Sequence, residues 1–202
     1  MAKCEFLFDF GSPNSYLAWK VLPDIEERTG ARFDYVPVLL GGIFKATGNA
    51  SPAVAFAGVK GKMAYEMLEM RRFIAKHGLS AFTMNPHFPV NTLHLMRGAI
   101  YAQQQNFLPA YMDAVMHHMW EAPKKMDEPE VIVAALGASG LDANAILEGA
   151  QDAGVKAALI ENTENAVARG VFGAPSFFVG DELFFGKDRL AAVEEEILAR
   201  SA

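Results

Sequence analysis

The stretch that decides the fold reads Phe6-Leu7-Phe8-Asp9-Phe10-Gly11-Ser12-Pro13-Asn14-Ser15-Tyr16-Leu17. Its aromatic half predicts a buried strand from Cys4 to Phe10, because it lacks the alternation of a strand with one solvated face. Ser12 then caps a helix that starts at Pro13, where a missing N–H costs nothing. A hydroxyl is therefore expected at a helix N-terminus, where backbone amides and the helix dipole favour an anion.

Two serines, Ser12 and Ser15, occupy this strand-to-helix corner. A serine cannot exchange disulfides, but its hydroxyl can donate a hydrogen bond to a thiolate that another molecule supplies. Ser12 is equally explained as an ordinary N-cap, and the two roles are compatible.

Composition limits the class of protein. A chain of 202 residues that is 51% apolar suits one domain, or one domain with a large insertion. Its net charge of −6 argues against a nucleic acid or an anionic membrane as partner. A single cysteine, Cys4, allows no internal disulfide. Because Met1-Ala2-Lys3 leads directly into the first strand and no apolar run reaches roughly 20 residues, we expect a cytoplasmic protein.

Two sheet-forming segments flank a long helical middle. The first is a βαβ unit, made of the strand from Cys4, a helix from Pro13 to about Thr29 and a strand over 33–39. Pro23 should kink that helix. The middle, from Gly41 to about Ala168, is helical, with loop signals at 41–42 and 47–52.

The second sheet-forming segment is a hairpin followed by a helix. Strands over 176–179 and 182–185 flank the turn Gly180-Asp181, and the last helix runs from Lys187 to Arg200. This order predicts an α/β thioredoxin-like fold, with βαβ and ββα halves and a large all-helical insertion. We expect residues 1–40 and 170–202 to form the thioredoxin-like domain and residues 41–169 the helical insertion domain.

The motifs of this chain, in their order, resemble one group of thioredoxin-fold proteins. The group is the kappa-class glutathione transferases with the 2-hydroxychromene-2-carboxylate isomerases, within the larger disulfide-oxidoreductase-A-like family. The resemblance spans essentially the whole chain, and it is strong for this group but less decisive for the isomerases over the transferases. Its motifs are Phe8-Asp9-Phe10-Gly11-Ser12-Pro13, Lys62 and Tyr65 with Glu69 and Arg72, Phe88-Pro89-x-Asn91-Thr92-Leu93, Glu161-Asn162-Thr163, Arg169-Gly170-Val171-Phe172-Gly173-Ala174-Pro175-Ser176-Phe177 and Phe185-Gly186-Lys187-Asp188-Arg189-Leu190.

The resemblance implies glutathione as cofactor and Ser12 as the catalytic residue that stabilises its thiolate. It implies that glutathione is bound by Asn49, Lys62, a cis Ala174-Pro175 loop, Lys187 and Asp188, and that the substrate is bound by Asn14 and Tyr65. Two positions depart from the usual pattern, Glu69 for an aspartate and Asn14 for an aromatic residue. Each residue also has a structural explanation, as a cap, a trans proline, a turn residue, a first-turn acid or part of a solvated helix face.

As function, the resemblance implies an isomerase that interconverts 2-hydroxychromene-2-carboxylate and trans-o-hydroxybenzylidenepyruvate in aromatic catabolism. The glutathione thiolate adds reversibly, the ring opens, a bond rotates and glutathione is regenerated. The alternatives are a kappa-class-like transferase or peroxidase, which consumes glutathione, and a non-catalytic thioredoxin-like binding module. We expect a homodimer, and no metal site, since no cysteine pair or His-x-x-x-His is present.

Overall fold

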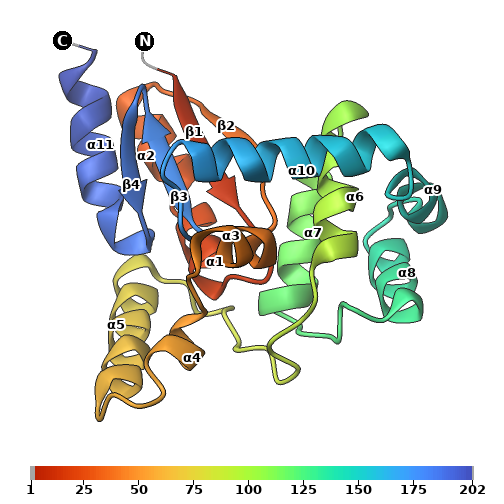
Figure 1. The fold of residues 1–202 in the computed structure, drawn as a ribbon, viewed down its shortest axis with the longest axis horizontal. Helices are drawn as coiled ribbons and strands as arrows, with labels where there is room; N and C mark the ends of the chain where they lie inside the picture. The colour runs from red at the N-terminus through yellow and green to blue at the C-terminus, as the bar shows by residue number, and fades with distance from the viewer. Residues whose placement is uncertain (1–2, 202) are drawn as a thin grey trace.

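A four-stranded mixed sheet forms the centre of the computed structural model, which describes residues 3–201 (Figure 1). The strands are β1 (Cys4–Phe8), β2 (Phe33–Pro37), β3 (Ser176–Val179) and β4 (Glu182–Phe185). They lie in the order β2-β1-β3-β4. β1 is parallel to β2 and antiparallel to β3, and β4 is antiparallel to β3. Met1 and Ala2, on which the expected N-terminus rests, lie outside the described residues.

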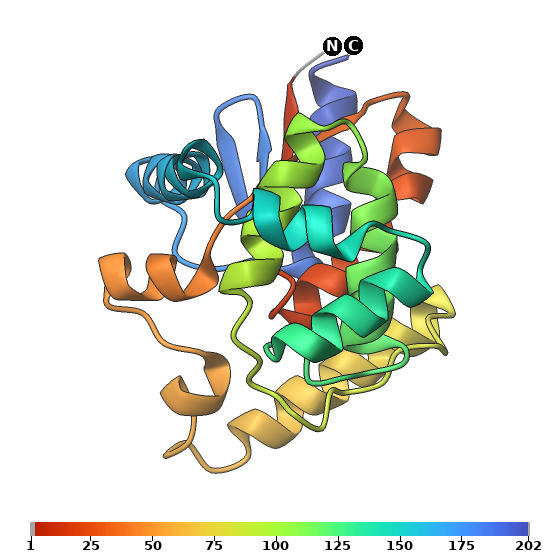
Figure 2. The ribbon, with the colours of Figure 1, turned by 90° about the vertical axis from the view of Figure 1, so that its right-hand side faces the viewer.

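Helices make up most of the remaining chain (Figures 1 and 2). They are α1 (Pro13–Trp19), α2 (Leu22–Thr29), α3 (Leu40–Thr47), α4 (Pro52–Ala55), α5 (Lys62–His77), α6 (Leu93–Gln104), α7 (Leu108–Trp120), α8 (Pro129–Ala138), α9 (Ala143–Gly149), α10 (Ala153–Ala168), a 3₁₀ turn η1 (Lys187–Arg189) and α11 (Leu190–Ala199). Within the described residues, no helix combines the length and apolar character that a membrane crossing requires.

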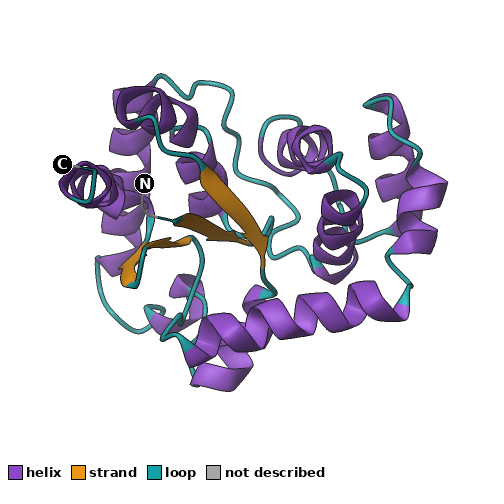
Figure 3. Ribbon diagram, turned by 90° about the horizontal axis from the view of Figure 1, so that it is seen from above, coloured by secondary structure: helices purple, strands orange, loops and turns teal. Residues whose placement is uncertain are grey.

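Both faces of the central strand β1 are buried, because its residues enter apolar clusters on opposite sides of the sheet. Phe6 stacks on Phe8 and Phe177, with ring centroids 5.5 and 5.4 Å apart, in the large cluster that contains side chains of α1, α2 and α11. Leu7 and Phe178 enter the smaller cluster, with side chains of α3 and α10. Figure 3 shows helices on both sides of the sheet. The unalternating aromatic run of β1 therefore has the two-sided burial expected from the sequence.

Three expectations about helices are wrong in detail. The helix expected over 13–29 is two helices, because Pro23 lies in the first turn of α2, where its missing N–H is tolerated, and α1 has already ended. The glycines at 41–42 lie inside α3 and not in a loop. The last helix begins at Leu190, after η1, and not at Lys187.

The C-terminal hairpin has the bounds expected from the sequence. Gly180 has a φ of 60°, a left-handed conformation that glycine adopts without steric cost. Gly78 likewise ends α5 in the left-handed region, with a φ of 65°. The division at residues 40/41 and 169/170 stays a prediction, and one apolar cluster includes side chains from both expected domains.

Candidate active site

The corner between β1 and α1 is built around the buried side chain of Ser12. Its Oγ accepts a hydrogen bond from the backbone N–H of Ser15 at 3.2 Å, so Ser12 is the N-cap of α1. Its hydroxyl donates to the carbonyl oxygen of Ala174 at 2.9 Å. The Ala174–Pro175 peptide bond is cis. The fold thus joins a hydroxyl at a helix N-terminus to a loop that lies 162 residues away in the sequence.

A buried carboxylate, Asp9, organises the backbone before this corner. It is 1% exposed and accepts three hydrogen bonds, from the N–H groups of Gly11 and Leu40 and from the hydroxyl of Thr92, at 2.8, 2.7 and 2.7 Å. Burial raises the pKa of Asp9, against the lowering effect of these bonds. β1 ends at Phe8, two residues earlier than expected, and Asp9 ties the corner to the starts of α3 and α6.

Neither Asp9 nor Thr92 was assigned a role from the sequence. The sequence did contain one indication for Asp9. An acidic residue within an aromatic run that is expected to be buried needs hydrogen-bond partners. The identity of those partners depends on how α3 and α6 pack, and no sequence spacing shows it.

Asn49 lies beside the cis-proline loop. Its Nδ2 donates to the carbonyl of Phe172 at 2.8 Å, two residues before Ala174. Its Oδ1 accepts from the N–H of Ala50 at 2.8 Å. Asn49 therefore holds the segment after α3 against the loop that contains Ala174, and both ends of its amide have partners within the chain.

Lys187 and Asp188 lie in η1, which packs against α1. The Lys187 side chain is 5% exposed and the Asp188 side chain 61%, and their Nζ and Oδ1 atoms are 2.5 Å apart. The Lys187 ammonium also lies 5.0 Å from the ring centroid of Phe73 on α5. A buried cation and an accessible carboxylate are thus paired next to the helix that Ser12 begins.

Lys62 and Tyr65 lie on α5 and are not bonded to this corner. The Lys62 Nζ pairs with Glu66 at 2.6 Å and lies 4.9 Å from the ring centroid of Phe56. Tyr65 is 52% exposed. Among the described residues, neither side chain has a hydrogen bond or ion pair with Ser12, Ala174 or Asp188, although Lys187 lies against Phe73 of the same helix.

The same face of α5 carries a second ion pair, between Glu69 and Arg72. The hydrogen bond from Arg72 lowers the pKa of Glu69, and the charge of Lys187 contributes to the same direction. This face therefore has the solvated, ion-paired character that is the structural explanation of Lys62 and Tyr65.

Asn14, in the first turn of α1, has a buried Oδ1 with no hydrogen-bond partner among the described residues, and the Oγ of Ser15 is in the same condition. A buried acceptor without a partner costs free energy unless a ligand or a water molecule donates to it. Asn14 is therefore placed for a contact that the chain itself does not supply.

A charged cluster fixes α1 against the end of α7. Glu121 accepts a hydrogen bond from the Tyr16 hydroxyl at 2.9 Å, and its carboxylate lies 2.8 Å from Lys20 Nζ and 3.0 Å from His117 Nδ1. Burial raises the pKa of Glu121, but the bonds from Lys20, His117 and Tyr16 outweigh burial and lower it from 4.5 to about 2. The ionised form of Glu121 therefore stabilises the position of the helix that carries Ser12.

Glu121→Gln should reduce the free energy of unfolding at neutral pH by about 1–3 kcal/mol, since it weakens charge-assisted hydrogen bonds. Because folding lowers the pKa of Glu121, its contribution is complete above pH 4.5 and is lost as the pH falls towards about 2. Urea unfolding of both proteins across this range should show the difference shrink. Glu128→Gln, in an exposed pair with Lys125, is the control and should have little effect. A pH-independent difference would contradict the role of the Glu121 charge.

Residues 3–198 match the family described as DSBA-like thioredoxin domain. The chain therefore belongs to the DSBA-like thioredoxin family, and the expected fold class, an α/β thioredoxin-like fold with a helical insertion, is confirmed.

Similarity to named relatives indicates the group within this family to which the chain belongs. The chain is 32% identical to 2-hydroxychromene-2-carboxylate isomerase of Sphingobium xenophagum, over 96% of this chain and 97% of that protein. It is 28% identical to glutathione S-transferase kappa 1 of Caenorhabditis elegans, over 96% of this chain and 90% of that protein. A solved structure of 2-hydroxychromene-2-carboxylate isomerase superimposes with a TM-score of 0.80 at 27% identity, covering 98% of this chain and 96% of that one. The chain thus belongs to the isomerase group of the family and is an enzyme, as the resemblance implied.

Proposed function

We propose that this protein is a glutathione-dependent isomerase that interconverts 2-hydroxychromene-2-carboxylate and trans-o-hydroxybenzylidenepyruvate. The observation that carries the proposal is the Ser12 hydroxyl, held at the N-terminus of α1 and 2.9 Å from the carbonyl of Ala174. The relatives support it from two sides, because the isomerases share the reaction type and the kappa-class transferases are named for glutathione.

The residues at the corner fit glutathione by their chemistry. Asp188 is an accessible carboxylate for the α-ammonium group of the γ-glutamyl end, and Lys187 beside it is a cation for the α-carboxylate. Ala174 offers backbone groups to the peptide part, as an added strand would use them. The unpartnered Oδ1 of Asn14 can accept a hydrogen bond from a ligand. Glutathione, when bound, supplies the nucleophilic sulfur.

The chain contributes stabilisation of charge at one atom. The Ser12 hydroxyl turns from the Ala174 carbonyl and donates to the thiolate, while its Oγ still caps α1. The dipole of α1 favours the same negative charge. Asp9 and Glu121 keep the backbone of this corner and α1 in place, so the donor does not have to reorganise when charge develops.

The reaction is tested by following the absorption spectrum of 2-hydroxychromene-2-carboxylate with the protein, with and without glutathione. We expect isomerisation that requires glutathione and leaves the amount of free thiol unchanged, because the cofactor is regenerated. Consumption of thiol in proportion to turnover would favour the transferase or peroxidase. Isomerisation at the same rate without glutathione would contradict the proposed cofactor.

No disulfide reductase activity is expected from this protein. The corner carries Ser12 and Ser15, and Cys4 is buried in β1, where burial and the nearby charges of Asp34 and Glu26 raise the pKa of its thiol. A thiol with a raised pKa is a poor source of the thiolate that exchange needs. Insulin reduction with dithiothreitol should match the reagent blank, with thioredoxin as positive control. A rate well above the blank that survives Cys4→Ser would contradict the assignment of the corner.

The cytoplasm is the proposed location, because a single cysteine can form no internal disulfide, which fits a reducing compartment. A homodimer is the proposed assembly, and sedimentation equilibrium would test it.

A further inference from the structure

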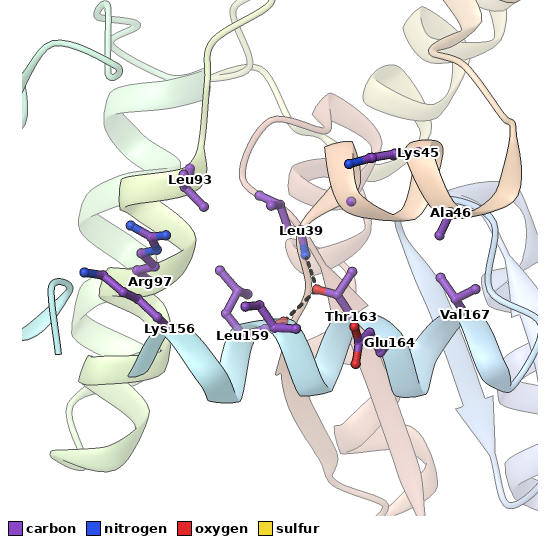
Figure 4. A pocket seen from close by; sticks show the side chains of 12 residues that line it. Leu39, Lys45, Ala46, Leu93, Arg97, Lys156, Leu159, Thr163, Glu164 and Val167 are labelled. Atoms are coloured by element: carbon purple, nitrogen blue, oxygen red, sulfur yellow. Dashed lines mark hydrogen bonds between the residues drawn. The ribbon is translucent and has the colours of Figure 1, made fainter. Parts of the chain in front are cut away.

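A cleft of about 350 Å³ lies between α3, α6 and α10 (Figure 4). Its lining includes none of Ser12, Asn14, Ala174, Lys187 and Asp188, so it is separate from the corner described above. It adjoins the same framework, however. Leu39 and Leu93 line the cleft, and each is next in sequence to a residue that donates a hydrogen bond to Asp9.

Three cations surround the cleft, Lys45 from α3, Arg97 from α6 and Lys156 from α10. Figure 4 shows Arg97 and Lys156 side by side at one end of it. Among the described residues, none of the three forms an ion pair. Glu164 is the single acid of the lining, so the cleft is positively charged in a protein whose net charge is −6.

The walls are apolar. Leu93 and Leu159 lie near Arg97 and Lys156, and Leu39 lies further along the cleft, beside Thr163 (Figure 4). The hydroxyl of Thr163 is already used, because it donates to the carbonyl of Leu159 at 2.7 Å and accepts from the N–H of Leu39 at 3.0 Å. The cleft therefore offers positive charge and apolar surface, with little capacity for neutral hydrogen bonding.

We propose that this cleft is a binding site for a compact aromatic monocarboxylate. Its volume is within the range of small-molecule sites and leaves room for two fused rings. The ring system lies against the three leucines, and the carboxylate faces Arg97, whose planar guanidinium suits a carboxylate, with Lys156 beside it. A phosphate or another small inorganic anion would leave the apolar walls unused.

Binding of 1-naphthoate, measured by calorimetry without glutathione, tests the proposal. We expect saturable binding, and much weaker binding of the neutral analogue 1-naphthamide. The double variant Arg97→Met/Lys156→Met should weaken naphthoate binding roughly tenfold or more, by loss of charge-assisted contacts. Ala46→Phe should abolish it, because Ala46 is an exposed lining residue whose enlarged side chain fills the cleft from its rim.

Two controls make the result specific. Arg71→Met removes a positive charge from the exposed face of α5, away from the cleft, and should leave the dissociation constant unchanged. Ser12→Ala should also leave the dissociation constant of naphthoate unchanged, because Ser12 is not in the lining.

Absence of saturable binding, equal binding of the amide, or undiminished binding by folded Ala46→Phe would overturn the proposal. Loss of binding in Ser12→Ala would place the ligand at the corner and overturn it too. None of these outcomes depends on turnover, so the proposed isomerase activity stands or falls separately.

Discussion

Ser12→Ala should lower the turnover of the proposed isomerisation by roughly 10- to 1000-fold, which corresponds to about 1.4–4 kcal/mol of lost charge stabilisation. It should raise the apparent pKa of bound glutathione, because the hydroxyl that donates to the thiolate is gone. The affinity for glutathione should change much less, because the γ-glutamyl end and the peptide part of glutathione are proposed to bind at Asp188 and Ala174. Rates at saturating substrate and the ultraviolet absorbance of the thiolate as a function of pH measure the two effects.

Ser12→Ala removes both the N-cap of α1 and the proposed hydrogen-bond donor to the thiolate, and a second variant separates these two effects. Alanine at an N-cap costs about 0.5–2 kcal/mol of stability, and glycine only a few tenths. Ser12→Gly should therefore lose as much turnover as Ser12→Ala while it keeps more of its thermal stability. Ser15→Ala is the comparison at the same corner and should keep most of the turnover, because the cap of α1 and the hydrogen bond to Ala174 both belong to the Ser12 hydroxyl. Full turnover in Ser12→Ala, with an unchanged thiolate titration, would assign Ser12 to capping alone.

Asp188→Ala should weaken the binding of glutathione by about 10- to 150-fold, since it removes a charge-assisted contact of about 1.5–3 kcal/mol. The apparent pKa of the glutathione that still binds should change little, because Asp188 is proposed to hold the far end of the molecule. Equilibrium binding and the same thiolate titration measure these effects.

The Asp188 side chain also pairs with the buried ammonium of Lys187, so its removal has a structural component. Asp188→Asn keeps the size of the side chain and removes the charge, and thermal unfolding of both variants measures how much stability is lost. Asp181→Ala removes an exposed carboxylate from the β3–β4 turn and is the control. An unchanged dissociation constant in Asp188→Ala would assign Asp188 to the pair with Lys187 and would leave the γ-glutamyl end without its proposed partner.

Several elements could be predicted because their causes are local. The β3–β4 hairpin follows from Gly180-Asp181 between two apolar runs. The cap at Ser12 and the start at Pro13 are also local. The same reasoning was wrong for α3, because its first N–H donates to Asp9, and no local pattern reports that contact.

The candidate site divides in the same way. Ser12 could be found from its position after a strand. Lys62 and Tyr65 share a turn of α5, but the sequence did not show that Lys62 pairs with Glu66 or that Tyr65 is 52% exposed. A helical period states which side chains share a face but not which partner that face meets.

By its sequence alone, the chain determined a buried first strand, a hydroxyl at the following helix N-terminus and the absence of a reactive cysteine pair. These depend on neighbouring residues, whose conformations are restricted by sterics and by the need to satisfy backbone hydrogen bonds. The tertiary structure alone decided that Ser12 meets Ala174, that Asp9 joins three segments, and that Lys45, Arg97 and Lys156 surround one apolar cleft. Such contacts join residues far apart in sequence, and they form only when the burial of many apolar side chains together offsets the entropy lost in ordering the chain between them.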